Sequence, residues 1–140
     1  MDDKSIEILL VEDDEVDVMN VQRAFRKANI THPLHLASDG IDALALLRGS
    51  MSSVHKRLPR IILLDINMPR MNGLEFLREL RADPALRSLS VVILTTSAQD
   101  SDLRAAYRYN VSGYIVKPLA AKDFLEVVNT LKKYWEICEF

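Results

Sequence analysis

The sequence predicts an α/β fold in which helices cover both faces of a parallel, five-stranded sheet. Short apolar runs alternate along the chain with segments whose apolar residues recur at the i, i+3, i+4 spacing of amphipathic helices. Continuous apolar runs are typical of strands that are buried on both faces. Because crossovers between parallel strands are right-handed, this alternation favours a doubly wound sheet with helices on both sides.

The expected elements follow one another without a repeat, a low-complexity stretch or an interdomain linker. Strands are expected at 6–11, 34–37, 60–65, 90–95 and 113–118. Helices are expected between 12 and 29, around 43–47, at 74–83, around 103–107 and at 124–135. The polar segment 48–57 reads as a surface loop. We expect one domain over 1–140, with 134–140 an aromatic C-terminal tail that follows a helix ending near Lys133.

The composition argues against several classes of protein. With 18 basic and 20 acidic residues the formal net charge is -2, which does not favour a nucleic-acid or an anionic-membrane partner. Cys138 is the one cysteine, so the chain has no internal disulfide framework and suits a reducing compartment. The sequence shows neither a signal-peptide pattern nor an apolar run long enough to span a membrane. We therefore expect a cytoplasmic protein.

Polar residues follow four of the expected strands at the point where each strand ends. Glu12 and Asp13 follow the first strand, and Asp65, Thr95 and Lys117 close the third, fourth and fifth. Because open parallel sheets bind ligands beyond the carboxyl ends of their strands, we expect these groups to meet. Neighbouring carboxylates need a counter-charge, and magnesium prefers oxygen ligands of this kind. A carboxylate held beside the metal is also suited to attack phosphorus.

Each of these residues also has an ordinary structural interpretation. An acidic strand end is often only the start of a helix, and Asp14 and Glu15 fit that interpretation. Thr95 is compatible with an ordinary strand residue, and Lys117 with a surface lysine whose stem lies on apolar residues. Their coincidence at successive strand ends favours the functional interpretation.

The motifs "LLVEDD", "LLDINMPRMNG", "VVILTTS" and "GYIVKP" resemble, in order and spacing, the receiver domain of two-component response regulators. The resemblance covers essentially the whole chain. It implies the flavodoxin-like (CheY-like) doubly wound (βα)5 fold with strand order 2-1-3-4-5. It also implies a magnesium-dependent reaction in which a histidine kinase transfers a phosphoryl group to the chain, which then switches its protein contacts. Mn²⁺ or Ca²⁺ are expected to substitute for Mg²⁺.

The resemblance assigns a role to each residue that matches these motifs. Asp65 would be the phosphoryl acceptor. Asp13 would be a direct metal ligand together with Asp65, Glu12 would act largely through water, and the backbone carbonyl of Asn67 would complete the protein's ligands. Such a domain is not a conventional enzyme, although it assists its own phosphorylation and dephosphorylation.

The remaining motif residues would form the switch. Thr95 would be the switch hydroxyl, Lys117 the ammonium that binds the phosphoryl group, and Tyr114 the aromatic side chain that moves between exposed and buried positions. A cis peptide bond before Pro118 would aim Lys117 at the site.

Two alternatives stay open from the sequence. A phosphatase of the haloacid-dehalogenase type also combines an aspartate nucleophile with magnesium, a hydroxyl and a lysine, but it needs a second aspartate where this chain has Asn67. A receiver-like module that binds partners without phosphorylation is the other alternative.

The "LTTS" stretch, the long polar segment before the third strand and the aromatic tail resemble small single-domain regulators that accompany bacteriophytochrome histidine kinases. The resemblance implies a homodimer through the fourth helix, fifth strand and fifth helix. The aromatic tail, which contains Trp135, suggests a further partner contact.

Overall fold

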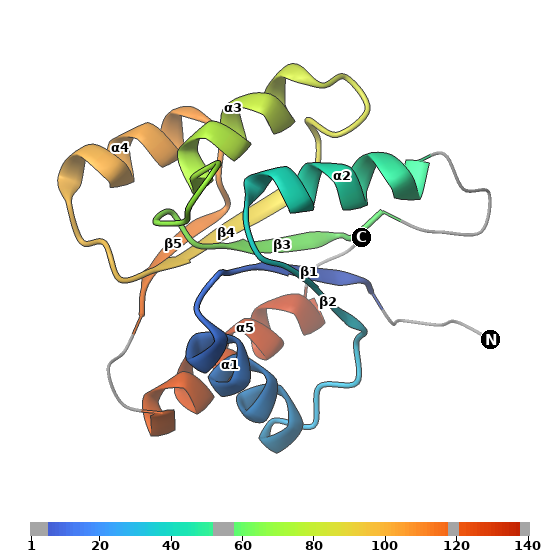
Figure 1. The fold of residues 1–140 in the computed structure, drawn as a ribbon. Coiled ribbons are helices and arrows are strands. Elements are labelled where there is room, and N and C mark those ends of the chain that lie inside the picture. Colours follow the sequence, from blue (N-terminus) through green and yellow to red (C-terminus); the bar gives the residue numbers. More distant parts are fainter. Residues whose placement is uncertain (1–5, 52–57, 118–120, 138–140) are drawn as a thin grey trace.

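A five-stranded parallel sheet in the order β2-β1-β3-β4-β5 forms the centre of the protein, as the family resemblance implies (Figure 1). The computed structural model describes residues 6–51, 58–117 and 121–137. Its strands are β1 (Ile8–Val11), β2 (Leu34–Ala37), β3 (Ile61–Leu64), β4 (Ser90–Thr95) and β5 (Gly113–Val116). Its helices are α1 (Glu15–Lys27), α2 (Gly40–Met51), α3 (Gly73–Ala82), α4 (Asp100–Arg108) and α5 (Ala121–Ile137).

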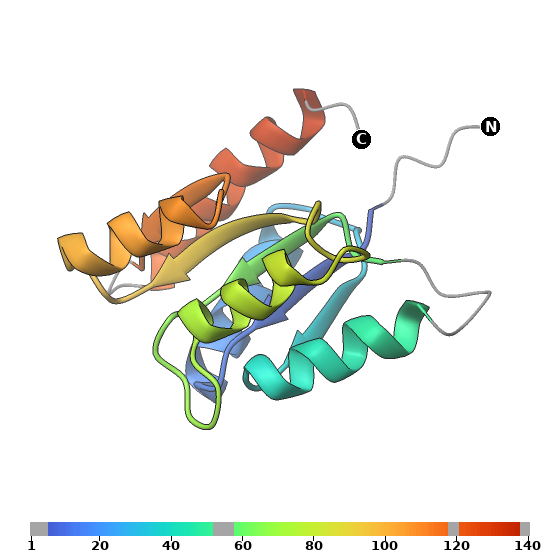
Figure 2. The ribbon, with the colours of Figure 1, turned by 90° about the horizontal axis from the view of Figure 1, so that it is seen from above.

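The helices form two layers, one on each face of the sheet. Helices α2, α3 and α4 cover one face, and α1 and α5 cover the other (Figures 1 and 2). Successive residues of a strand point to opposite faces, so Leu9 and Val11 lie in the first core while Ile8 and Leu10 lie in the second. This two-sided burial explains the continuous apolar runs of the central strands.

The edge strand β2 differs from the central strands in its burial. Leu36 is exposed and Ala37 is buried, whereas all four residues of β1 are buried. An edge strand pairs on one side only, which accounts for the weak apolar pattern of 34–37 in the sequence.

Helix α2 extends further than the sequence predicts. It ends at Met51, so the first four residues of the predicted 48–57 loop are helical. Arg48, in the last turn of α2, forms a hydrogen bond of 3.5 Å with Asp83 at the end of α3, and a basic residue there suits the helix dipole. The rest of the predicted loop lies outside the described residues, as do Cys138, Phe140 and the predicted cis peptide bond before Pro118.

Helix α5 continues to Ile137, so it includes Trp135, as the predicted range 124–135 does, and it does not end near Lys133. Trp135 is 5% exposed and packs edge-on against Phe25 of α1, with 6.2 Å between the ring centroids. Lys132 donates a hydrogen bond of 2.7 Å to the backbone carbonyl of Ala28. Trp135 therefore belongs to the core between α1 and α5, and its own side chain offers little surface to a partner. Ile137, by contrast, is 81% exposed.

Within the described residues, no helix combines the length and the apolar character needed to cross a membrane.

Candidate functional site

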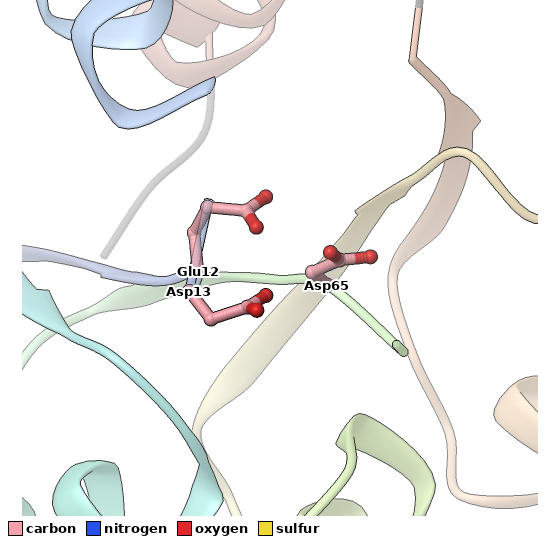
Figure 3. Close-up of side chains that lie close together, drawn as sticks. All are labelled: Glu12, Asp13 and Asp65. Carbon is pink, nitrogen blue, oxygen red and sulfur yellow. The ribbon is translucent and has the colours of Figure 1, made fainter. Parts of the chain in front are cut away.

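Three carboxylates gather at the carboxyl edge of the sheet. Glu12 and Asp13 follow β1, and Asp65 follows β3, which pairs directly with β1 through Val11 and Leu64. Figure 3 shows the carboxylates of Glu12 and Asp13 extending toward the side on which Asp65 lies. One ligand oxygen from each of the three lies within 4.8 Å of the others. The structure thus brings these sequence-predicted residues together.

The donor set of this cluster suits a hard divalent cation. Glu12 and Asp65 are buried, whereas Asp13 is exposed and open to solvent. Asn67 lies two residues beyond Asp65 in the loop between β3 and α3, and it is exposed. Carboxylate oxygens supplemented by a backbone carbonyl and water are the ligands that magnesium takes in proteins.

Lys117 inserts its ammonium group among the carboxylates. Its Nζ donates to Glu12, to Asp17 Oδ2 at 2.8 Å and to Asp65 Oδ2 at 3.4 Å. The Lys117 side chain is almost fully buried. The predicted meeting of Lys117 with Glu12 and Asp65 is confirmed by these contacts.

Asp17 is a member of the site that the sequence analysis missed. It lies in the first turn of α1, one helical turn before the buried Val21 and two turns before Ala24. An acidic residue on the buried face of an amphipathic helix was the signal that could have revealed it. Its partner Lys117, 100 positions away, could not be read from that spacing.

Burial and ion pairing shift the pKa values of the charged groups at this site in opposite directions. Burial raises the pKa of Glu12 from 4.5 to about 7, although hydrogen bonds from Lys117 and from the backbone of Asp14 work against this rise. Burial alone would lower the pKa of Lys117, but its hydrogen bonds to Asp17 and Glu12 outweigh burial and raise that pKa above its usual value. Lys117 is therefore a firmly charged ammonium.

Because the pKa of Glu12 is raised, we expect the metal-free protein to lose stability as the pH rises toward neutrality. The folded pKa of Glu12, about 7, lies above the unfolded value of 4.5, so between them the folded state holds a proton that the unfolded state releases. Raising the pH through this window lowers the free energy of unfolding by at most about 3 kcal/mol. Lys117 stays charged in both states throughout the window.

Urea unfolding in EDTA at about pH 5 and about pH 8 measures this change in the native protein and in Glu12→Gln. The variant has no carboxylate at this position, so its stability is expected to fall less over the same interval. Equal changes in the two proteins would contradict the assignment of the proton to Glu12.

A hydroxyl group and a tyrosine lie next to the cluster on the β4 and β5 side. Thr95 is fully buried, and its Oγ1 accepts a hydrogen bond of 3.3 Å from the backbone N–H of Ser97. Tyr114 is partly buried, and its hydroxyl donates a hydrogen bond of 2.8 Å to the carbonyl of Ser97. Burial raises the pKa of Tyr114. Ser97, which the sequence analysis assigned no role, thus connects Thr95 with Tyr114.

The loop that carries Asn67 folds back tightly against Asp65. The backbone N–H of Gly73 donates to the carbonyl of Ile66 at 2.8 Å, and Asp65 Oδ1 accepts from the N–H of Ile66 at 2.7 Å. A Cβ atom at position 73 would lie 2.3 Å from the Asp65 carbonyl oxygen. Glycine is required here because a side-chain carbon would overlap the backbone of the acceptor residue.

A salt bridge connects this loop with the neighbouring loop between β2 and α2. Arg70, whose backbone has a φ of 63°, donates to Asp39 Oδ2 at 2.7 Å and to Asp42 Oδ1 at 3.0 Å. The backbone N–H of Gly40 donates to the Met71 carbonyl at 3.1 Å. The hydrogen bond from Arg70 lowers the pKa of Asp39. The two loops are therefore held together on the β2 side of the acidic cluster.

The sequence profile of the response regulator receiver domain matches residues 8–129, a range that contains all five strands and the acidic cluster. The chain belongs to the response regulator receiver family. The strand order and the placement of the cluster at the carboxyl edge of the sheet agree with this membership.

Two relatives match over most of the chain. The probable methanogenesis regulatory protein FilR2 of Methanothrix harundinacea is 40% identical over 128 residues, which are 91% of this chain and 82% of that protein. Response regulator Rcp1 of Synechocystis is 36% identical over 128 residues, which are 91% of this chain and 87% of that protein. A crystal structure of the Mn²⁺-bound form of Rcp1 has a TM-score of 0.84 at 34% identity and covers 96% of this chain and 97% of that chain.

A phosphorylated response regulator also resembles the chain closely. The crystal structure of the phosphorylated cyanobacterial phytochrome response regulator RcpA has a TM-score of 0.87 at 31% identity and covers 97% of each chain. These relatives favour a response regulator over both the phosphatase and the phosphorylation-independent module.

Proposed function

We propose that Asp65 accepts the phosphoryl group in this two-component response regulator, and that Glu12, Asp13 and the Asn67 carbonyl help to hold Mg²⁺ beside it. The observation that carries the proposal is the buried Asp65 carboxylate, which lies beside two further carboxylates and the ammonium of Lys117. The Mn²⁺-bound form of the relative Rcp1 supports a divalent cation at such a site, with Mn²⁺ or Ca²⁺ as substitutes for Mg²⁺.

In the transfer, an Asp65 carboxylate oxygen attacks the phosphorus of a phosphohistidine. A P–O bond to Asp65 forms, the P–N bond to the imidazole breaks, and the imidazole leaves with the electron pair and takes a proton. A bound Mg²⁺ would neutralise charge on the phosphoryl oxygens. Lys117, at 3.4 Å from Asp65 Oδ2, is placed to donate to another of those oxygens. Water then attacks the phosphorus of the acyl phosphate, the P–O bond to Asp65 breaks, and inorganic phosphate leaves with the proton balance taken up by solvent, which restores the Asp65 carboxylate.

The switch in this proposal runs from Thr95 to Tyr114. The Thr95 hydroxyl would turn to hydrogen-bond the phosphoryl group, which would end its present bond from the Ser97 N–H. Tyr114 is held by the carbonyl of the same residue, so a shift of Ser97 would free the Tyr114 side chain. The surface of α4 and β5 would then change its partner affinity.

The proposed partners are a phytochrome-type histidine kinase and a second copy of this chain. The phytochrome response regulator RcpA supports the first. Exposed side chains of Leu103 and Tyr107 on α4 and of Val116 on β5 support a homodimer through α4, β5 and α5. Sedimentation with and without a phosphoryl mimic tests the dimer, and a monomer in both conditions would contradict it.

The proposal places the protein in the cytoplasm, with neither a nucleic-acid nor a membrane partner.

Incubation with acetyl phosphate and Mg²⁺ is expected to add one phosphoryl group to Asp65. Acetyl phosphate replaces the kinase as donor, so the reaction depends on the site of this chain alone. Intact-mass spectrometry measures the addition in the native protein, in Asp65→Ala and in Asp100→Asn, an exposed acidic residue in the first turn of α4. The native protein and Asp100→Asn are expected to gain the phosphoryl group. Asp65→Ala is expected to gain none, and EDTA is expected to prevent the reaction in every protein. Equal labelling of Asp65→Ala would refute the assignment.

A further inference from the structure

Lys117 is shared between the proposed phosphoryl site and helix α1. The three N–H groups of its ammonium face three carboxylates, those of Glu12, Asp17 and Asp65. The distance to Asp65 Oδ2, 3.4 Å, is longer than the 2.8 Å to Asp17 Oδ2. In this state the ammonium is therefore held more closely by α1 than by the acceptor carboxylate.

We propose that Asp17 is a positioning residue which holds Lys117 toward α1 and competes with the phosphoryl group on Asp65 for the Lys117 ammonium. The inference rests on the proposed role of Asp65. A phosphoryl group brings three strongly accepting oxygens to a site where all three Lys117 donors are already engaged. The bond from Lys117 to Asp65 is the longer one, at 3.4 Å against 2.8 Å to Asp17. A short bond to a phosphoryl oxygen on Asp65 therefore requires Lys117 Nζ to move toward Asp65, which lengthens its bond to α1.

Asp17, and not Glu12, is the partner that Lys117 can release at low cost. The Glu12 side chain is 2% exposed, so it would remain a buried carboxylate without its ammonium partner. The Asp17 side chain is 22% exposed, so water can hydrogen-bond its carboxylate when Lys117 moves away. The exchange therefore runs between Asp17 and the phosphoryl group, and Asp17 stabilises the unphosphorylated state relative to the phosphorylated one.

The test compares Asp17→Asn with two matched variants. Asp17→Glu keeps the charge, and Glu15→Gln removes one charge from the first turn of the same helix at an exposed position. Fluorine NMR measures the concentration of beryllofluoride, a phosphoryl mimic, that half-saturates each protein in excess Mg²⁺. We expect Asp17→Asn to lower this concentration about fivefold, the size of one partly exposed ion pair. Asp17→Glu and Glu15→Gln are expected to stay near the native value.

A metal-free crystal structure of Asp17→Asn supplies a readout that does not depend on the mimic. With the charge of Asp17 removed, Lys117 Nζ is expected to approach Asp65 Oδ2 to about 2.9 Å. Three results would each overturn the proposal. They are a Lys117 position unchanged from that in the native protein, a beryllofluoride affinity equal to that of Glu15→Gln, and a beryllofluoride affinity weaker than native. If the native protein binds no beryllofluoride, the proposed function fails, and the metal-free structure still decides whether Asp17 holds Lys117.

Discussion

Gly73→Ala is expected to lower the free energy of unfolding by about 3 kcal/mol and to prevent phosphorylation of Asp65. The new Cβ would lie 2.3 Å from the Asp65 carbonyl oxygen and 2.8 Å from the Cα of Ile66. Both atoms belong to backbone that is held by the Asp65–Val11 hydrogen bond of 3.0 Å and the Gly73–Ile66 hydrogen bond of 2.8 Å, so no flexible side chain can yield. The backbone of the acceptor residue itself must move.

Gly49→Ala is the matched control for this substitution. Gly49 lies inside α2, and a Cβ there would have no heavy atom within 4 Å. Alanine is expected to stabilise this helix by up to about 1 kcal/mol. Urea unfolding measures both variants, and labelling by acetyl phosphate with intact-mass detection measures the site. A Gly73→Ala protein with native stability and native labelling would show that the loop can relax around a methyl group.

Trp135→Ala is expected to cost about 3–5 kcal/mol of folding stability, because it opens a cavity between α1 and α5. The indole is 5% exposed and packs edge-on against Phe25. Its Nε1 is buried without a hydrogen-bond partner among the described residues. Trp135→Phe keeps an aromatic ring and removes this unpaired donor, so its cost is expected to be less than half that of alanine.

Ile137→Ala is the control for Trp135→Ala. Ile137 lies on the same helix two residues later and is 81% exposed, so its replacement is expected to change stability by no more than about 0.5 kcal/mol. Thermal or urea unfolding of the three variants measures these costs. If Trp135→Ala were as stable as Ile137→Ala, the packing of α5 against α1 would contribute little to the fold.

The layers of the fold and the main site residues could be predicted because they depend on local patterns. Two-sided burial produces continuous apolar runs, and 90–95 is a strand with the predicted bounds. Parallel strands bring their carboxyl ends to one edge, which is why Asp13, Asp65 and Lys117 could be placed together before their distances were known.

The errors and omissions concern side chains whose partners are distant in the sequence. Trp135 follows Val128 and Leu131 on the buried face of α5, so its spacing indicated the core, but its position near the chain end was read as a surface tail. Asp17 lies on the buried face of α1, where an acidic residue is informative only once Lys117 is known to reach it. Ser97 acts through its backbone, which no side-chain pattern reports.

The Arg70–Asp39 salt bridge lies on one side of the site, and the other side has different contacts. Toward β2, the loop after Asp65 is held by the Arg70–Asp39 salt bridge and by the Gly40–Met71 backbone hydrogen bond of 3.1 Å. Toward β5, the contacts of Thr95 and Tyr114 converge on one short segment at Ser97. Under the proposed role of Asp65, we expect a displacement there to pass to α4 and β5 rather than to α2.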